Sequence, residues 1–220
     1  MQCIKDTIKN INIVIGCNIG CSYCYARMNN NRFHTIDDFN KPVFFENKLK
    51  MLDNKRHTAY LLTGQSDLSG WNEEWKDKVF SKMKENETTQ YIFLTKRPEN
   101  INLKETPDNG WFGVTVTSSK EKTRIDYLRN NIKAKHYHIT FEPMFDDVGK
   151  LDLNNISWIV IGTETGNRKR KISSKREWVF NIYNQAKEKN IPVFMKEDLL
   201  GILNEDEFVQ EFPKEFGEIK

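Results

Sequence analysis

Three of the four cysteines of this chain lie close together, at Cys17, Cys21 and Cys24. Their C-x3-C-x2-C spacing places them on one short loop, directly after the apolar residues 11–15. Three thiolates on one loop can bind one face of a metal cluster, but ordinary ferredoxin-type clusters and structural zinc sites use four protein ligands. No fourth cysteine stands at a comparable spacing, and Cys3 is not expected to be a ligand. The motif therefore predicts a [4Fe-4S] cluster in which one iron is left open to another ligand.

Two other interpretations of these cysteines stay open at the level of the sequence. His34 could complete a zinc site of four ligands, because imidazole binds zinc well. The chain would then be a non-catalytic nucleic-acid-binding protein with a structural zinc site. The three residues could also be free thiols that lie near one another by chance.

The cysteine spacing resembles the signature of the radical SAM superfamily, and Tyr23, the aromatic residue before the last cysteine, also matches it. In that superfamily S-adenosylmethionine (SAM) chelates the open iron of a [4Fe-4S] cluster. Reductive cleavage of SAM then yields a 5′-deoxyadenosyl radical, which abstracts a hydrogen atom from a substrate. The resemblance implies a radical SAM enzyme with these two cofactors and an external electron donor of the flavodoxin or ferredoxin type.

Length and composition bound the class of protein. A chain of 220 residues suits one domain, expected to span residues 1–220, and can bury a proper core. The net charge of +3 is too small to establish a nucleic-acid partner by itself. Clustered cysteines without a signal peptide favour a metal site in a reducing compartment, so we expect a cytoplasmic protein. No apolar stretch approaches the roughly 20 residues that cross a bilayer, so no membrane association is expected.

Short apolar runs alternate with segments of helical periodicity along most of the chain. This alternation predicts an α/β fold in which parallel strands and covering helices form a partial, TIM-like (β/α) barrel of six to seven units. Residues 31–57 interrupt the rhythm and could be a lid, a partner surface or a plain connection. The expected strands are 11–16, 58–64, 91–96, 112–117, 137–142, 158–162 and 192–196. The expected helices are 22–30, ended by Asn29–Asn31, then 43–52, 72–85, 120–130, 174–189 and 204–211.

Charged and hydroxyl residues follow these strands, and in a parallel barrel the chemistry gathers at the carboxyl ends of the strands. We expect Lys96 or Arg97 to pair with the SAM carboxylate, and Glu142 to accept from the ribose or from a substrate. The turn at Gly64 lies where the superfamily carries a Gly-Gly-Glu turn, and residues 158–162 resemble its adenine-supporting strand. The residues expected to contact SAM are Tyr23, Gly64, Gln65, Ser66, Asp67, Lys96, Thr115, Thr117, Glu142, Ile161, Thr163 and Glu164.

A barrel that does not close leaves a lateral opening for a large substrate, either nucleic acid or protein. The best basic patch is the run of residues 168–171, although such a run can also be a solvated loop. The residues expected to contact a substrate are Arg97, Arg168, Lys169 and Lys196.

Four further motifs relate the chain to one particular family of radical SAM-like proteins. They are Thr95-Lys96-Arg97-Pro98, Gly113-Val114-Thr115-Val116, Phe141-Glu142-Pro143 and the stretch from Val160 to Gly166. In this order they are similar to an uncharacterised family of small radical SAM-like proteins of phages and mobile elements, over residues 11–198. Some members are accompanied by a separate three-Cys-motif partner protein, which the resemblance implies here as well. Many members have a longer gap between the first two cysteines, and the family implies no particular substrate.

Overall fold

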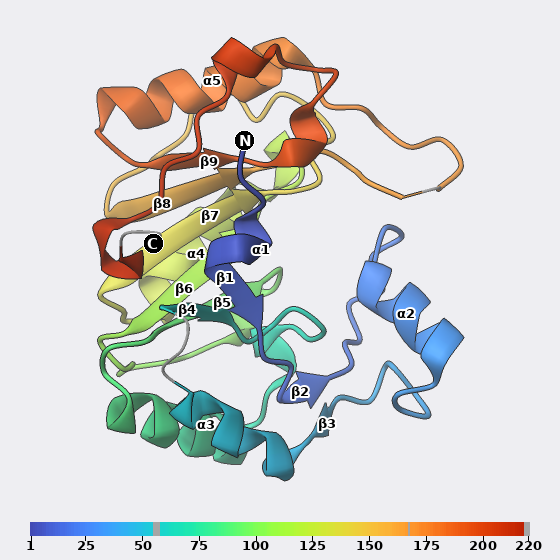
Figure 1. Cartoon of the computed structure of the whole chain (residues 1–220), viewed down its shortest axis with the longest axis vertical. Helices are drawn as coiled ribbons and strands as arrows, with labels where there is room; N and C mark the ends of the chain where they lie inside the picture. The colour runs from blue at the N-terminus through green and yellow to red at the C-terminus, as the bar shows by residue number, and fades with distance from the viewer. Residues whose placement is uncertain (55–57, 167, 218–220) are drawn as a thin grey trace.

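Seven parallel strands form a curled sheet that wraps partway round a barrel (Figure 1). The computed structural model describes residues 1–54, 58–166 and 168–217, so the last three residues of the 31–57 segment lie outside the described residues. Each strand of the sheet pairs with the next one along the chain, which confirms the predicted partial TIM-like barrel. The strands, in spatial order, are β1 (Ile8–Asn10), β4 (Ala59–Leu61), β5 (Gln90–Thr95), β6 (Gly110–Thr115), β7 (His136–Phe141), β8 (Ile156–Ile161) and β9 (Val193–Met195).

The central strands are buried on both faces, because successive residues point to opposite sides of the sheet. On β5, Phe93 packs outward with its ring centroid 5.8 Å from that of Phe80, whereas Ile92 belongs to a separate cluster inside the barrel. On β8, Ile159 belongs to the outer cluster and Trp158 to the inner one. The near-continuous apolar runs of the sequence therefore serve two cores.

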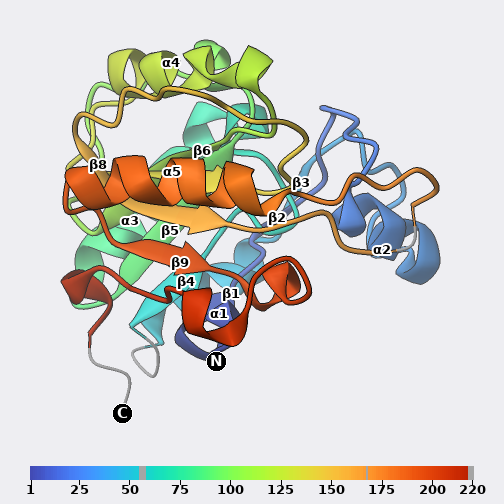
Figure 2. The ribbon, with the colours of Figure 1, turned by 90° about the horizontal axis from the view of Figure 1, so that it is seen from above.

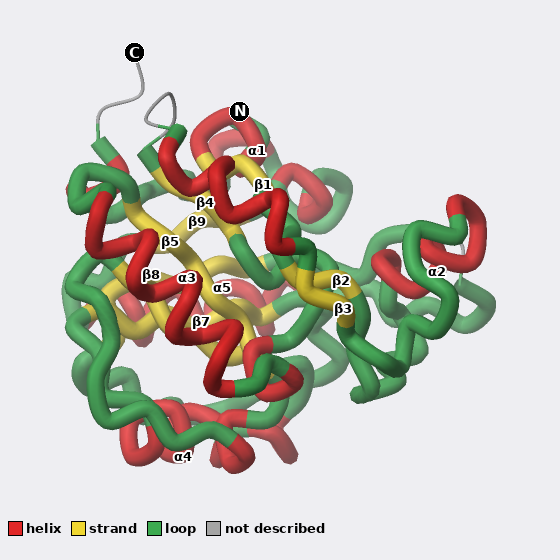
Figure 3. Tube along the Cα trace, turned by 90° about the horizontal axis from the view of Figure 1, so that it is seen from below, coloured by secondary structure: helices red, strands yellow, loops and turns green. Residues whose placement is uncertain are grey.

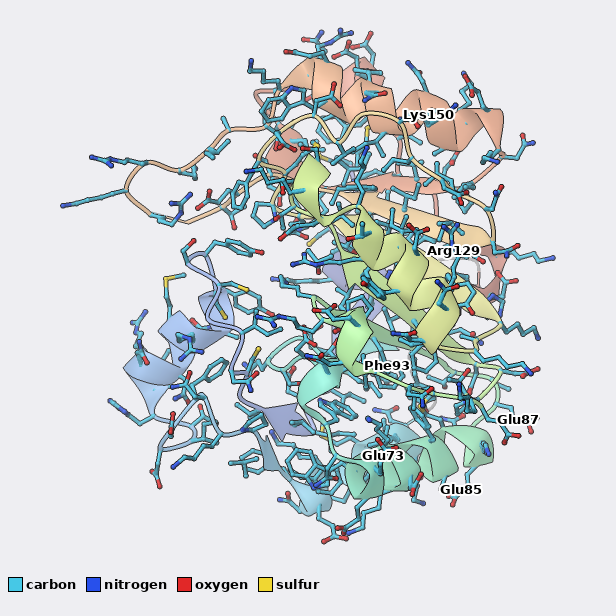
Figure 4. The ribbon with its side chains drawn as sticks, turned by 180° about the vertical axis from the view of Figure 1, so that it is seen from behind. Glu73, Glu85, Glu87, Phe93, Arg129 and Lys150 are labelled. Carbon is cyan, nitrogen blue, oxygen red and sulfur yellow. The ribbon has the colours of Figure 1, made fainter. Side chains whose placement is uncertain are left out.

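Three helices cover the outer face of the sheet (Figures 2 and 4). They are α3 (Glu73–Glu85), α4 (Thr123–Asn131) and α5 (Arg176–Glu188). Val79, Phe80 and Met83 form the buried stripe of α3, while Glu73 and Glu85, labelled in Figure 4, are exposed at its two ends. Among the described residues, no helix combines the length and apolar character that crossing a membrane requires.

The two ends of the chain cover the opening between β1 and β9. Residues 209–211 run antiparallel to β9, with the Met195 amide donating to the Val209 carbonyl at 2.8 Å. Gln210 then joins the N-terminal segment, because it accepts from the Gln2 amide at 2.7 Å and donates to the Gln2 carbonyl at 2.8 Å. A short helix, α1 (Ile4–Thr7), follows this contact and leads into β1. The free edge of β9 is thereby paired, which removes a template for aggregation.

The first predicted strand is wrong in its position. Residues 11–16 do not form one strand: β1 ends at Asn10, and Val14–Ile15 form β2, which pairs antiparallel with β3 (Val43–Phe44). The apolar run therefore pairs with two different strands. The Ile11 amide donates to the Leu61 carbonyl of β4 at 3.0 Å, whereas Val14 and Ile15 pair with β3. The β2–β3 pair carries α2 (Tyr25–Phe33) and its loops away from the main sheet (Figure 3).

Three helix predictions also need correction. Residues 43–52 form β3 and a 3-10 helix, Glu46–Asp53, and the predicted closing helix is only a 3-10 turn, Glu205–Glu207. Helix α2 does not end at the three asparagines, because the buried Asn30 side chain accepts from the Ile36 amide at 3.0 Å and donates to its carbonyl at 2.9 Å. Shorter 3-10 helices cover Leu68–Gly70, Pro98–Asn100, Ser119–Glu121, Glu197–Leu199 and Lys214–Phe216.

His138 of β7 lies inside the barrel and is only 1% exposed. Its ring lies over Gly113 of β6, where an added Cβ would be 2.4 to 2.5 Å from three ring atoms. Its Nε2 is 3.1 Å from the Phe93 carbonyl, which can only accept, so this nitrogen carries the proton. Among the described residues, Nδ1 has no hydrogen-bond partner. Burial lowers the pKa of His138 to about 4, so the folded protein keeps the ring neutral.

This burial predicts a loss of stability in mild acid. The unfolded chain takes up a proton on His138 below pH 6.5, while the folded chain resists until about pH 4, so stability falls as the pH decreases through that window. Between pH 7 and pH 5 the wild type should lose about 2 kcal/mol more of its free energy of unfolding than His138→Gln. Urea denaturation at the two pH values measures this difference. Equal losses in both proteins would show that His138 is not held neutral.

Candidate functional site

A cavity of about 480 Å³ lies at the carboxyl ends of the strands, on the inner side of the sheet. The three clustered cysteines line it from one side, and residues at the ends of the strands from β4 to β9 line it from the other. Of the residues expected at the site, the cavity is lined by Cys17, Cys21, Tyr23, Cys24, Gly64, Gln65, Ser66, Asp67, Lys96, Thr115, Glu142, Thr163, Glu164 and Lys196. The sheet thus brings together most of the residues that the sequence suggested.

The cysteine loop is attached to the sheet through Gly16. Its amide donates to the Gln65 carbonyl at 3.0 Å, and it forms a parallel bridge with Ser66 beyond the end of β4. Gly16 has a φ of +115°, and a Cβ there would lie 2.8 Å from the Cα of Pro42. Only glycine satisfies both conditions. On the other side of the loop the Cys17 amide donates to the Phe39 carbonyl at 2.7 Å.

Arg27 supports the same loop from α2. Its guanidinium donates to the Cys17 carbonyl at 2.7 Å and lies over the Phe39 ring, 5.0 Å from the centroid. Its amide donates to the Cys24 sulfur at 3.4 Å, which makes Cys24 the N-cap of the helix. The loop is therefore held by backbone and guanidinium contacts, so its conformation does not depend on a bound metal alone.

The three cysteines are free, half-buried thiols that line the same cavity. Burial, with smaller contributions from Asp67, Cys21 and Cys24, raises the pKa of the Cys17 thiol to about 11. A bound cation would offset this cost, because thiolates are the form that binds metals. Within the described ranges no group of three or more His, Cys, Asp or Glu side chains has the geometry of a metal site. As a donor set, three thiols of one loop that line one cavity fit a cluster bound at three corners.

Neither Cys3 nor His34 lines the cavity. The Cys3 sulfur donates to the Glu197 carboxylate at 3.0 Å, next to the N-terminal segment. His34 is exposed and forms the left-handed C-cap of α2, with a φ of +48°. A zinc site completed by His34 would therefore need a rearrangement of the end of this helix.

Asp67, which lines the cavity, also holds the turn after β4. Its buried carboxylate accepts from the Ser69 amide at 3.0 Å, from the Thr95 hydroxyl at 2.6 Å and from the Lys96 amide at 2.8 Å. These donors occupy the carboxylate, so Asp67 joins the turn after β4 to the end of β5. Ser66 is similarly engaged, since its hydroxyl accepts from the Trp71 indole at 3.0 Å.

The turn itself leaves backbone groups near the cysteine loop. Gly64 allows a close approach, because a Cβ there would lie 3.0 Å from Asn12 Oδ1. The Tyr25 hydroxyl donates to the Gly64 carbonyl at 2.5 Å, which links α2 to the end of β4. Tyr25 was not among the predicted site residues, because nothing in the sequence relates it to a turn 39 residues away.

Lys96 lies between the cysteine loop and the strand ends. Its ammonium is 3.4 Å from the Thr115 hydroxyl and 5.8 Å from the centroid of the Tyr23 ring. No carboxylate of the described residues lies within ion-pair distance of it. Lys96 is therefore a cation of the cavity that is free to pair with a ligand.

Five of the predicted contact residues do not line the cavity, and one of them is Arg168, which lies on the loop after β8. Arg97 is exposed, and Lys169 lies on the exposed loop after β8. The Thr117 hydroxyl donates to Glu121 at 2.6 Å. Ile161 packs in the outer core, because the alternation on β8 turns Val160 toward the cavity instead.

Lys196 is held by two carboxylates, Glu142 and Asp198, the latter at 3.1 Å. Burial opposes the charge of Lys196, but these two carboxylates raise its pKa above the ordinary value. Asp198 also accepts from the Thr163 amide at 3.0 Å. The group as a whole carries one excess negative charge at the end of β7 and β9, where it can accept from hydroxyl or ammonium groups.

The loop after β8 folds back onto the buried Glu164. Arg168 donates to this carboxylate through two nitrogens, and the Ile172 amide donates to it at 3.2 Å. These contacts with Arg168 hold the pKa of Glu164 below its ordinary value. Thr163 is also engaged, because its hydroxyl accepts from the Ser174 amide at 3.1 Å. Glu164 therefore lines the cavity wall, and Arg168 holds its carboxylate from the loop.

His138 and Thr140 line the inner part of the cavity and were not among the predicted residues. Because successive residues of a strand point to opposite faces of the sheet, the alternation along β7 could have placed both residues on the inner face of the barrel. The sequence does not show that Gly113 leaves room for the imidazole.

The packing of Gly16 predicts which glycine of the cysteine loop is indispensable. Gly16→Ala should lower the free energy of unfolding by about 3 kcal/mol or more, from left-handed strain plus a backbone clash. Gly20→Ala is the matched control, because Gly20 has a φ of +77° but no atom of a described residue would lie within 4 Å of an added Cβ. It should cost about 1 kcal/mol. Urea denaturation of both variants checks this, and equal losses would contradict the role of the Pro42 contact.

The chain matches the family model described as Protein of unknown function (DUF5131) over residues 2–218. No curated protein and no solved structure is significantly similar to it. The match covers nearly the whole chain, including the cysteine loop, the half-barrel and the C-terminal segment. The protein is therefore a member of the DUF5131 family.

Proposed function

We propose that this protein is a radical SAM enzyme that binds a [4Fe-4S] cluster through Cys17, Cys21 and Cys24 and reductively cleaves SAM. One observation carries the proposal: a C-x3-C-x2-C loop is attached beyond the end of β4 of a parallel half-barrel, and its three thiols line a cavity at the strand ends. When bound, such a cluster would supply one electron to SAM, which gives methionine and a 5′-deoxyadenosyl radical for hydrogen abstraction from an unknown substrate.

The side chains of the cavity match the groups of SAM. Lys96, which has no carboxylate partner among the described residues, would pair with the SAM carboxylate. The Glu142 carboxylate, which belongs to a group with one excess negative charge, would accept hydrogen bonds from the SAM ammonium or from the ribose hydroxyls. Tyr23 and the Val160 side of β8 would flank the adenine. The protein's own contribution is to position these groups and exclude water, since the cofactors carry the difficult step.

A structural zinc site in a non-catalytic nucleic-acid-binding protein is the alternative proposal. It would require a fourth ligand, and the nearest sequence candidate, His34, is exposed at the end of α2 and does not line the cavity. The cavity would also have no role in such a protein. The enzyme proposal uses both features, so the present geometry favours it.

The proposal implies two kinds of partner. An electron donor of the flavodoxin or ferredoxin type would reduce the cluster, which suits a cytoplasmic location. The resemblance also suggests a three-Cys-motif partner protein and a macromolecular substrate, either protein or nucleic acid.

The proposal predicts different effects for two adjacent cations. In the anaerobically reconstituted protein, Lys96→Ala should weaken SAM binding by about 1.5–3 kcal/mol, the range for a charge-assisted hydrogen bond. Arg97→Ala is the matched control and should leave the affinity unchanged, because Arg97 is exposed and does not line the cavity. Isothermal calorimetry measures both. Absence of SAM binding to the wild type would refute the enzyme proposal, and an effect of Arg97 alone would refute the assigned carboxylate partner.

A further inference from the structure

Two segments project beside the mouth of the cavity, and they come from distant parts of the chain. One is α2, and the other is the loop after β8, of which residues 165, 166 and 168–172 are described. Figures 1, 2 and 4 all show them on the same side of the molecule, beyond the carboxyl ends of the strands. Tyr25 and Met28 line the cavity from α2, and Thr165 and Gly166 line it from the loop. We call the exposed described residues of 22–36, which contain α2, and of 165–176, which contain this loop, the mouth surface.

The mouth surface is basic and has no acidic residue of its own. Residues 22–36 and 165–176 together hold eight of the chain's 34 Lys and Arg residues and none of its 31 Asp and Glu residues. Arg168 and Arg176 are neutralised by Glu164 and Glu207. Lys169, Arg170 and Lys171 are exposed, and they form no ion pair with a described residue. Because the whole chain carries only +3, this surface concentrates positive charge against a net acidic remainder.

The α2 part of the mouth surface also exposes aromatic and apolar side chains. Tyr25 is 51% exposed, Met28 55% and Phe33 65%. The Arg32 guanidinium lies over the Phe33 ring, 5.1 Å from the centroid, so a flat cation and a flat ring are presented together. Large apolar side chains normally avoid such exposure when they form a contiguous patch, and such patches mark interaction sites.

We infer that the mouth surface binds single-stranded nucleic acid. Phosphates would pair with Lys169, Arg170 and Lys171, and bases would stack on Tyr25, Phe33 and Arg32. This combination of a basic track with aromatic platforms is what single-strand binding uses. A duplex would use the cations but not the rings, because its bases are already stacked.

The inference deepens the proposed function and rests on it in one respect: a strand held here would present a nucleotide to the cavity in which the radical is generated. The binding itself does not require the cluster. Failure of either idea can therefore be recognised separately, since strand binding is measured on the cluster-free full-length chain and SAM binding on the reconstituted protein.

The test is fluorescence anisotropy with a labelled, mixed-sequence single strand of about 20 nucleotides, titrated at several salt concentrations. The Lys169→Ala, Arg170→Ala, Lys171→Ala triple variant should lower the slope of log K against log salt by about 2, since each phosphate contact contributes about 0.7. Phe33→Ala should lower the affinity about five- to a hundredfold without a change in slope. The matched control is the triple variant of Lys84, Lys104 and Lys214 to alanine, three exposed lysines away from the cavity lining.

Three outcomes would overturn the inference. The first is an absence of single-strand binding at low salt, and the second is an equal loss in the matched control. The third is equal or better binding of another partner. A duplex of the same sequence would bind as tightly as the single strand, or anionic vesicles would bind the chain through Phe33 while the oligonucleotide does not bind. Selective loss in the mouth-surface variants, with the control unchanged, supports it.

Discussion

The hydrogen bond between the Gly16 amide and the Gln65 carbonyl fixes the site on the scaffold. It attaches the cysteine loop beyond the end of β4, and it requires a backbone that passes close to Pro42 with a positive φ. A side chain at this position would push the loop away from the sheet. The thiols would then lie beside the barrel instead of over the cavity. The location of the cysteines therefore depends on one residue that has no side chain.

The half-barrel leaves the cavity open on one end and closes it on the other. Phe212 and Phe216 of the C-terminal segment pack against Trp158 in the inner core, while residues 2 and 210 join the two chain ends. Polar groups near the open end fall into two kinds. The side chains of Asp67 and Thr117 form hydrogen bonds that hold turns. Lys96 has no anionic partner among the described residues. Lys96 is therefore the better candidate to bind a ligand, because the polar groups of Asp67 and Thr117 already hold turns.

Much of the fold could be predicted from the sequence, because buried parallel strands appear as apolar runs separated by helical stretches. The first strand was misplaced since residues 11–15 look like one strand, yet they pair with β4 and then with β3. The cysteines and Lys96 were found because their types and places after strands carry chemical meaning. The sequence could not predict the hydrogen bonds of Tyr25, Asp198 and Asp67, because each depends on a partner that only folding brings close.

The claim that three cysteines of one loop hold a [4Fe-4S] cluster is tested most directly by iron and sulfide content after anaerobic reconstitution. The account predicts a brown protein with about four irons per chain for the wild type and for Cys3→Ala. Cys24→Ala should lose the bound iron, and Cys3→Ala is its matched control because the Cys3 sulfur bonds to Glu197 outside the cavity. A colourless protein that holds zinc instead, or loss of the iron in Cys3→Ala, would contradict the account.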